Sequence, residues 1–163
     1  MNINIILGSP SDLKILENGL SFLKEMEIKY NVRIASAHRA HNFLQEIITK
    51  YEEKTALYIC VAGKSAHLGG VVASLTKKPV VCVPVYNPET SGFDALLSMS
   101  QMPQGIPTAT MGFGVSGFAN ACIFSAQVLA LQQKNLKEKL NDYRNNLEEK
   151  VKHYDRKHQE IYY

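Results

Sequence analysis

Short, continuous apolar runs alternate through most of the chain with stretches in which apolar side chains recur every three or four positions. The first run, at 3–7, is followed by the turn sequence GSPSD and by leucines at helical spacing between Leu13 and Leu23. The same alternation continues beyond it. It predicts strands at 3–7, 30–35, 57–62, 80–85 and 108–111, and further helices at 41–51, 68–75, 93–101 and 117–131.

These strand-like runs show little polar alternation, which indicates strands that are buried on both faces. Parallel strands need long crossover connections, and helical segments between the runs supply them. The helices then cover both faces of the sheet. We therefore expect residues 1–133 to form one α/β domain, a three-layer α/β/α sandwich around a parallel sheet. A chain of 163 residues suits a single core of this kind.

Residues 134–163 follow a different pattern, in which a narrow apolar stripe runs through a highly charged segment. The stripe consists of Leu136, Leu140, Tyr143, Leu147, Val151 and Tyr154. This spacing predicts an amphipathic C-terminal extension helix that belongs to the same single domain. Because a helix added to a complete sandwich still needs a surface to cover its stripe, we hypothesise that it is an oligomerisation arm that packs on a neighbouring subunit.

Composition narrows the possible partners. The chain has 18 Lys and Arg against 15 Asp and Glu, and this net charge of +3 is too small to indicate a nucleic-acid partner. Apolar stretches end well before the roughly 20 residues of a membrane span, and no signal peptide precedes the first strand. We therefore expect a cytoplasmic protein with no membrane partner. Cys60, Cys82 and Cys122 form no CxxC pair, and we expect buried, reduced thiols.

Three polar turns follow the first three predicted strands. Ligands of doubly wound sheets bind beyond the carboxyl ends of the strands, where helix N-termini offer free backbone donors. The turns therefore form the candidate site. They contain Gly8, Ser9, Ser11 and Asp12 in the first, Ser36, Ala37, His38 and Arg39 in the second, and Gly63, Lys64, Ser65, Ala66, His67, Leu68, Gly69 and Gly70 in the third.

The side chains of these turns suit a phosphorylated ligand, although a simpler structural explanation exists for each. Ser9, Ser11 and Asp12 could merely cap a helix, or they could receive the ribose and phosphate of a nucleotide. Arg39 could be a solvated surface residue or a bidentate phosphate ligand. His38 lies directly after an apolar run and could be structural. An imidazole can also donate and accept a proton near neutral pH, which would make this residue a general acid/base.

His67 follows the next strand, so the two histidines occupy adjacent turns. A metal site is the main alternative for them. No third His or Cys stands at ligand spacing, and the turn around His67 contains no acidic residue. We therefore expect no metal. His41 is expected to face solvent at the start of a helix.

Three familiar motifs fail on their context. Gly112, Gly114 and Gly117 spell GxGxxG, but this fingerprint opens a βαβ unit, and here only a helix follows. A dinucleotide-dependent oxidoreductase is therefore a distant alternative. The string Gly63–Lys64–Ser65 imitates the end of a P-loop, but Tyr58 occupies the position of the first glycine. No GxSxG elbow is present near residues 114–118, so a serine hydrolase has no support.

With GSPSD, SAHR and AGKSAHLGG in this order, the chain resembles the PurE family, which carboxylates aminoimidazole ribonucleotide in purine biosynthesis. The similarity continues through Pro84 and Val85, 91–94, the run QMPQGIPTAT at 101–110, and 119–121. The resemblance implies a flavodoxin-like (Rossmann-like) core, a homo-octamer, a small-molecule nucleotide substrate with carbon dioxide, and no metal or organic cofactor.

The resemblance also implies roles for individual residues. His38 corresponds to the general acid/base of the family. Substrate-binding positions are Ser9, Ser11, Asp12, Ser36, Ala37, Arg39, Gly63, Lys64, Ser65, Ala66, His67 and Leu68. Among them, Ser9, Asp12 and Arg39 match positions that bind the ribose and phosphate. The loop 63–68 matches the one that closes over the imidazole and its carboxylate.

The family has two branches, and the third turn bears on the choice between them. A mutase moves the carboxylate of N5-carboxyaminoimidazole ribonucleotide (N5-CAIR) from the exocyclic nitrogen to ring carbon C4, whereas an AIR carboxylase uses free carbon dioxide. His67 and Leu68 match the mutase turn AGGAAHLPG. Lys64 and Ser65 are typical of the other branch, and Gly69 replaces the usual proline. The AHL sequence and the run at 101–110 favour the mutase. A non-catalytic nucleotide-binding module is the more distant alternative.

Overall fold

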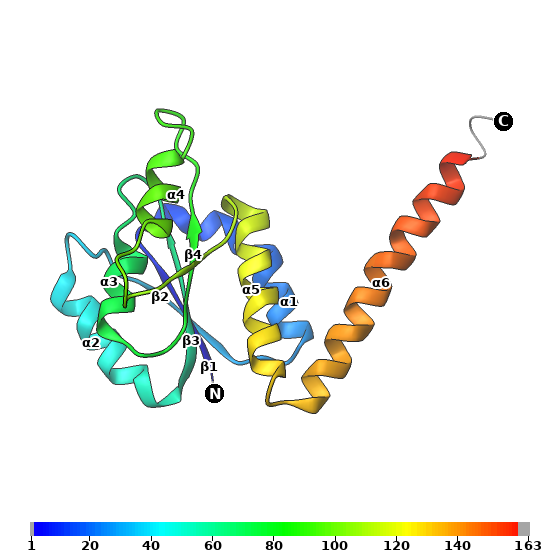
Figure 1. The fold of residues 1–163 in the computed structure, drawn as a ribbon, viewed down its shortest axis with the longest axis horizontal. Helices are drawn as coiled ribbons and strands as arrows, with labels where there is room; N and C mark the ends of the chain where they lie inside the picture. Colours follow the sequence, from blue (N-terminus) through cyan, green and yellow to red (C-terminus); the bar gives the residue numbers. More distant parts are fainter. Residues whose placement is uncertain (1, 160–163) are drawn as a thin grey trace. The chain divides into compact units, whose positions relative to one another are not determined.

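A computed structural model describes residues 2–159 and contains a five-stranded, fully parallel sheet with the strand order β2-β1-β3-β4-β5 (Figure 1). This order is that of flavodoxin-like folds, so the expected three-layer α/β/α sandwich is confirmed. The strands are β1 (Asn2–Leu7), β2 (Tyr30–Ile34), β3 (Thr55–Ala62), β4 (Val80–Pro84) and β5 (Ala109–Thr110).

The chain divides into two compact units with a boundary after Ser125. The first unit contains the sheet and α1 (Glu17–Glu25), α2 (His41–Tyr51), α3 (Leu68–Leu75) and α4 (Phe93–Ser100). α5 (Gly114–Ala130) crosses the boundary. The division into residues 1–133 and 134–163 stays a prediction.

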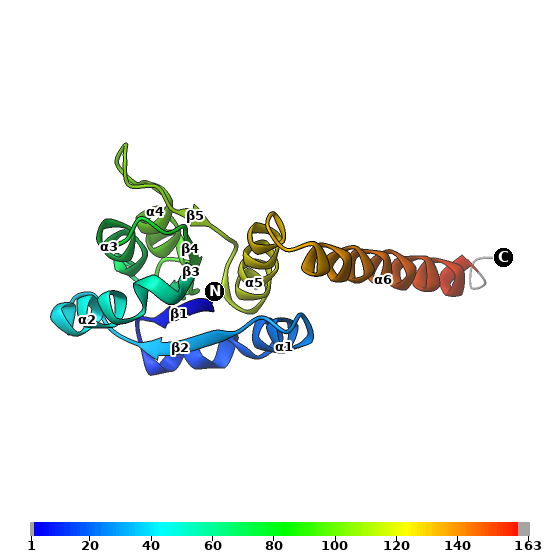
Figure 2. The ribbon, with the colours of Figure 1, turned by 90° about the horizontal axis from the view of Figure 1, so that it is seen from below.

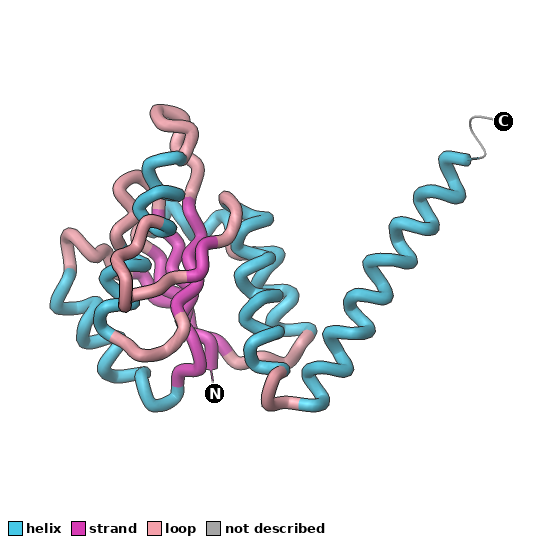
Figure 3. The backbone as a smooth tube through the Cα atoms, in the orientation of Figure 1, coloured by secondary structure: helices cyan, strands magenta, loops and turns pink. Residues whose placement is uncertain are grey.

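Helices cover both faces of the sheet in the first unit (Figures 2 and 3). α3 packs against α2 and α4 as well as against β3 and β4, which places these three helices on one face. On the opposite face, Gly19 of α1 lies against Phe118 and Cys122 of α5. The central strands are therefore enclosed on both sides, which explains why β3 and β4 are almost continuously apolar.

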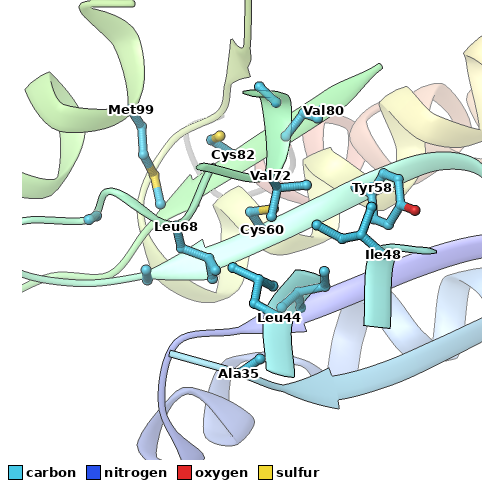
Figure 4. Close-up of a cluster of buried hydrophobic side chains, with 14 of the residues drawn as sticks. Ala35, Leu44, Ile48, Tyr58, Cys60, Leu68, Val72, Val80, Cys82 and Met99 are labelled. Atoms are coloured by element: carbon cyan, nitrogen blue, oxygen red, sulfur yellow. The ribbon is translucent and has the colours of Figure 1, made fainter. Parts of the chain in front are cut away.

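The core under α2, α3 and α4 is built from every second residue of the strands (Figure 4). Tyr58 and Cys60 of β3 and Cys82 of β4 point into it, together with Leu44 of α2 and Val72 of α3. The thiols of Cys60, Cys82 and Cys122 are buried and free, as expected. Burial raises the pKa of Cys60 well above its ordinary value and that of Cys82 and Cys122 to about 12.

Gly69 of α3 shows how closely this layer packs. A Cβ atom at this position would overlap the Sγ of Cys82, while it would lie 3.6 Å from the Cβ of the same residue. A side chain at position 69 is therefore excluded by one sulfur atom and not by the backbone. This contact gives a physical reason for the glycine at a position where the resemblance leads one to expect proline.

The helical pattern after β1 takes a different form from the one its leucines suggest. A 3-10 helix, η1 (Pro10–Ile15), comes first and α1 begins only at Glu17. Leu16 at the break is buried and Leu23 is completely buried, but Leu13 is 47% exposed. Ser9 caps the start of this 3-10 helix, and Leu16 is both the C-cap of η1 and the N-cap of α1.

The second unit contains α6 (Lys134–Gln159), and residues 160–163 of the predicted arm lie outside the described residues. The apolar stripe is present on this helix: Leu136 is buried, whereas Val151 is 68% exposed. Lys152 pairs with Glu148 and Glu149 on the charged side. Over residues 2–159, no helix is both long enough and apolar enough to cross a membrane.

Candidate active site

The turns that follow β1, β2, β3 and β4 line a cleft of about 890 Å³ at the carboxyl edge of the sheet. β1 lies between β2 and β3, so the chain reverses its direction of winding here, at the topological switch point of the fold. The cleft is lined by every residue to which the sequence analysis assigned a catalytic or substrate-binding role: Ser9, Ser11, Asp12, Ser36, Ala37, His38, Arg39, Gly63, Lys64, Ser65, Ala66, His67 and Leu68. Gly8 lines it as well, whereas Gly69 and Gly70 of the third turn do not.

The first turn is organised by a reciprocal capping box. The Ser9 hydroxyl accepts a hydrogen bond from the backbone N–H of Ser11 (3.3 Å), and Asp12 accepts one from the backbone N–H of Ser9 (3.0 Å). Burial raises the pKa of the Asp12 carboxyl, while the Ser9 and Ser11 bonds and the charge of Lys14 oppose the shift. The capping expected from the sequence is thus present, and Asp12 Oδ1 also accepts a long 3.5 Å hydrogen bond from the Ser11 hydroxyl.

The second turn orients a guanidinium group. Ser36 Oγ accepts hydrogen bonds from both the backbone N and the Nε of Arg39, each at 3.3 Å. In the described part of the chain, Arg39 forms no ion pair with a carboxylate. The exposed guanidinium is therefore held in position by its Nε with its charge available to an anion in the cleft.

The side chains of His38, after β2, and His67, after β3, are in contact, although β1 lies between these two strands. His38 Nε2 lies 2.8 Å from His67 Nδ1, and the rings are edge to face with their centroids 4.9 Å apart. One nitrogen must donate and the other accept, so the pair shares a single proton between these two atoms. Within residues 2–159, no group of three His, Cys, Asp or Glu side chains is placed to hold a metal ion.

The third turn carries His67 and a strained lysine. Lys64 has φ of 58°, in the left-handed region that disfavours residues with a Cβ. The backbone N–H of His67 donates to the carbonyl of Ser65 (2.8 Å), while Ala66 and Leu68 are buried. The buried residues anchor the turn, and Lys64, Ser65 and His67 remain exposed at the cleft.

The fourth turn was missed by the sequence analysis. Val85, Tyr86, Asn87 and Pro88 also line the cleft, and Tyr86 is 59% exposed. Asn87 Oδ1 accepts a hydrogen bond from the backbone N–H of Glu89 (3.2 Å), which folds this turn on itself. The available signal was positional, because β4 ends at the same edge of the sheet as its neighbours. Lys14 of η1 was missed in the same way.

Gly117 of the GxGxxG string has a packing role. A Cβ at Gly117 would overlap the carbonyl of Gly112, so the start of α5 approaches this backbone closely. The string follows β5 at the edge of the sheet, and no strand comes after α5 in the described residues. The βαβ unit that a dinucleotide fingerprint needs is therefore missing from residues 2–159.

The strand order and the cleft define an α/β protein of the flavodoxin-like class with its site at the switch point. The AIR carboxylase family model matches residues 2–150. The chain therefore belongs to the AIR carboxylase family, the PurE family that its turns resemble.

Relatives and solved structures agree with this assignment. The chain is 46% identical over 160 residues to the N5-carboxyaminoimidazole ribonucleotide mutase of Methanocaldococcus jannaschii, covering 98% of this chain and 99% of the relative. It is 37% identical over 150 residues to the enzyme of the same name from Bacillus subtilis, covering 91% and 93%. The crystal structure of Treponema denticola PurE superposes with a TM-score of 0.87 at 29% identity, covering 95% and 96% of the two chains.

Proposed function

We propose that the protein is an N5-carboxyaminoimidazole ribonucleotide mutase of purine biosynthesis, which converts N5-CAIR to the C4-carboxylated nucleotide (CAIR). Relatives of matching length carry this name. The observation that carries the proposal is the histidine pair at the switch point, beside an oriented arginine and a buried carboxyl group. This arrangement suits a phosphorylated substrate that exchanges a proton.

The nucleotide lies across the first three turns. Arg39 binds the phosphate with its guanidinium, oriented by Ser36. Asp12 accepts a hydrogen bond from a ribose hydroxyl, and Ser9 and Ser11 line the same region. The loop 63–68 closes over the imidazole.

The aminoimidazole ring supplies most of the chemistry, because it is an electron-rich enamine. In the first step the bond between the exocyclic nitrogen and the carboxyl carbon breaks. Its electron pair stays on nitrogen, and protonated His38 delivers a proton there. Carbon dioxide is then held beside C4, where confinement raises its effective concentration and excludes water. C4 attacks the carbon of this molecule, and neutral His38 removes the C4 proton to restore the aromatic ring.

His67 is the positioning partner in this scheme. Its 2.8 Å contact with His38 fixes the orientation of the His38 ring and decides which ring nitrogen carries hydrogen. The catalytic step needs His38 to release one proton and recover one, so each turnover leaves the pair unchanged. No metal or organic cofactor enters the scheme.

The test offers the purified protein two alternative substrates and follows formation of CAIR. A mutase converts N5-CAIR without added bicarbonate, whereas an AIR carboxylase converts aminoimidazole ribonucleotide (AIR) with carbon dioxide. The basic residue and serine at Lys64 and Ser65 favour this second candidate. Binding of a nucleotide with no conversion of either substrate would instead favour a non-catalytic module. Binding of NAD or FAD, measured by calorimetry, would support the dinucleotide alternative.

We further propose that the enzyme is a cytoplasmic homo-octamer in which α6 packs on a neighbouring subunit. The apolar stripe of α6, with Leu147 and Val151 exposed, supports this assignment. Light scattering on a variant that ends at Gln133 should report a smaller assembly. Val151→Glu in the full chain should do the same, while Asn145→Glu on the opposite, polar face of α6 should not. An unchanged assembly in both the shortened variant and Val151→Glu would contradict the proposal.

A further inference from the structure

Lys64 is an exposed cation at the cleft for which residues 2–159 supply no acidic partner. It lines the cleft from the turn after β3, and no carboxylate of residues 2–159 lies within ion-pairing distance of it. Its backbone has φ of 58°, a conformation that glycine adopts more easily than lysine. Packing gives no reason for a lysine at this position, because its side chain is exposed.

Three cations line the cleft, and two of them are already accounted for. The charge of Lys14 acts on Asp12, where it lowers the carboxyl pKa against the larger effect of burial. Arg39 is held by Ser36 and serves the phosphate in the proposed function. A carboxylated aminoimidazole ribonucleotide brings one more negative charge than its phosphate provides. Lys64 is the remaining cation of the described cleft residues.

Strand order separates the turn that carries Lys64 from the turn that carries Arg39. The two residues follow β3 and β2, and the turn with Asp12 lies between them because β1 separates these strands. Adjacent strands lie about 4.8 Å apart, so the two outer turns are about 10 Å apart. A mononucleotide laid across this edge has its phosphate at one end, its ribose in the middle and its base at the other. His67, which contacts His38, belongs to the same turn as Lys64.

We propose that Lys64 binds the carboxylate of the nucleotide, and so distinguishes carboxylated from uncarboxylated aminoimidazole ribonucleotide. The inference rests on the proposed function. The ammonium group pairs with the carboxylate when it is on the exocyclic nitrogen and when it is on C4. Free carbon dioxide has no net charge, so the ion pair is lost while the carboxyl group is between the two atoms. Lys64 therefore increases the affinity for substrate and product, and it does not accelerate the step between them.

Calorimetric titration of CAIR and of AIR into the complete protein tests this assignment. Lys64→Met removes the charge and retains most of the side chain. It should weaken binding of CAIR about tenfold and change the affinity for AIR less than twofold. Lys64→Arg should recover most of the loss. Lys14→Met is the matched control, because it removes the other lysine of the cleft and should change both affinities by the same factor.

The affinities for CAIR and AIR separate the possible roles of Lys64. An equal loss for CAIR and AIR in Lys64→Met would mean that Lys64 contacts the phosphate, and it would overturn the inference alone. Unchanged affinity for both nucleotides would also overturn it. If the unmodified protein bound neither nucleotide, the proposed function would fail and the inference with it. Selective loss for CAIR, with recovery in Lys64→Arg, supports the assignment.

Discussion

At the amino-terminal end of the sheet polar side chains bond to one another, whereas at the carboxyl end they face a cleft. Glu52 accepts hydrogen bonds from Tyr58 (2.9 Å) and Thr76 (2.8 Å). Asn4 donates to Thr55 and accepts from Asn31 (3.0 Å). At the opposite edge, Arg39, Lys64 and the histidine pair have exposed polar atoms. Both ends are polar, but only one leaves its groups open to a ligand.

The difference separates structural from functional polar residues on physical grounds. Tyr58 is fully buried, and its hydroxyl would be costly without an acceptor. Glu52 supplies that acceptor, so this polar network follows from burial alone. His38 and Lys64 are exposed and would be equally well solvated in an unfolded chain. Their presence at the carboxyl edge needs another explanation, which the proposed substrate provides.

The largest expected effect tests the carboxyl end. His38→Asn should lower turnover of N5-CAIR at least about a hundredfold, because the general acid/base is lost. Nucleotide affinity, measured by calorimetry, should stay within a few fold. His41→Asn is the matched control, since His41 is an exposed histidine three residues later on α2 and should retain full activity. Turnover by the His38 variant comparable to that of the control would exclude the proposed mechanism.

The reciprocal change tests the amino end. Glu52→Ala should lower the free energy of unfolding by about 2 kcal/mol, because the buried Tyr58 hydroxyl loses its acceptor. Urea titration measures this loss, and the kcat/KM of the folded variant should be unchanged. Glu53→Ala, at an exposed neighbour, should cost much less. A loss of activity without a loss of stability would remove the distinction between the two ends.

An intermediate case lies beside the cleft but has a packing role. Gly69→Ala should destabilise the protein by about 1–3 kcal/mol through overlap with Cys82 Sγ. In a Cys82→Ala background the same change should cost far less, because the two Cβ atoms then lie 3.6 Å apart. Denaturant titration of all four proteins gives the coupling energy. Equal destabilisation in both backgrounds would show that the sulfur is not the cause.

The smallest effect concerns pH. Burial raises the pKa of Asp12 in the folded protein above its ordinary value of 3.8. As pH rises above that value, the unfolded chain releases this proton first, so ionisation of Asp12 lowers stability. The unfolding free energy should therefore decrease with pH more steeply than in Asp12→Asn, through the pH range just above 3.8. Denaturant titrations between pH 4 and 7 measure both slopes. A shallower slope for the unmodified protein would mean that folding lowers the pKa of Asp12, contrary to the prediction.

Much of the fold follows from local pattern, because strands of a covered parallel sheet are apolar and helices between them are periodic. The helices at 41–51 and 68–75 have the expected bounds. The break at Leu16 was not predictable, because the leucines from Leu13 to Leu23 keep one helical spacing through it. α5 begins at Gly114 and not at 117, since Gly114 tolerates φ of 59° at the start of the helix.

The site was predictable as far as it depends on topology. Parallel strands place the turns after them on one edge, and this rule alone gathered the residues of the first three turns. The contact between His38 and His67 was beyond reach, because it depends on the side-chain conformations of residues on two turns that β1 separates. Tyr86 and Asn87 were missed because they belong to no recognised motif. The local sequence pattern likewise does not predict the positive φ angle of Lys64.

The three buried thiols have a practical consequence. Thiolate is the form that reacts with maleimides, and a pKa of about 12 at Cys82 and Cys122 leaves almost none of it near neutral pH. The folded protein therefore behaves toward such labels as though it contained no cysteine. A fluorophore attached to Glu89→Cys, at the exposed tip of the turn after β4, would carry the signal alone. Its emission could then follow the arrival of nucleotide in real time without any native cysteine being replaced.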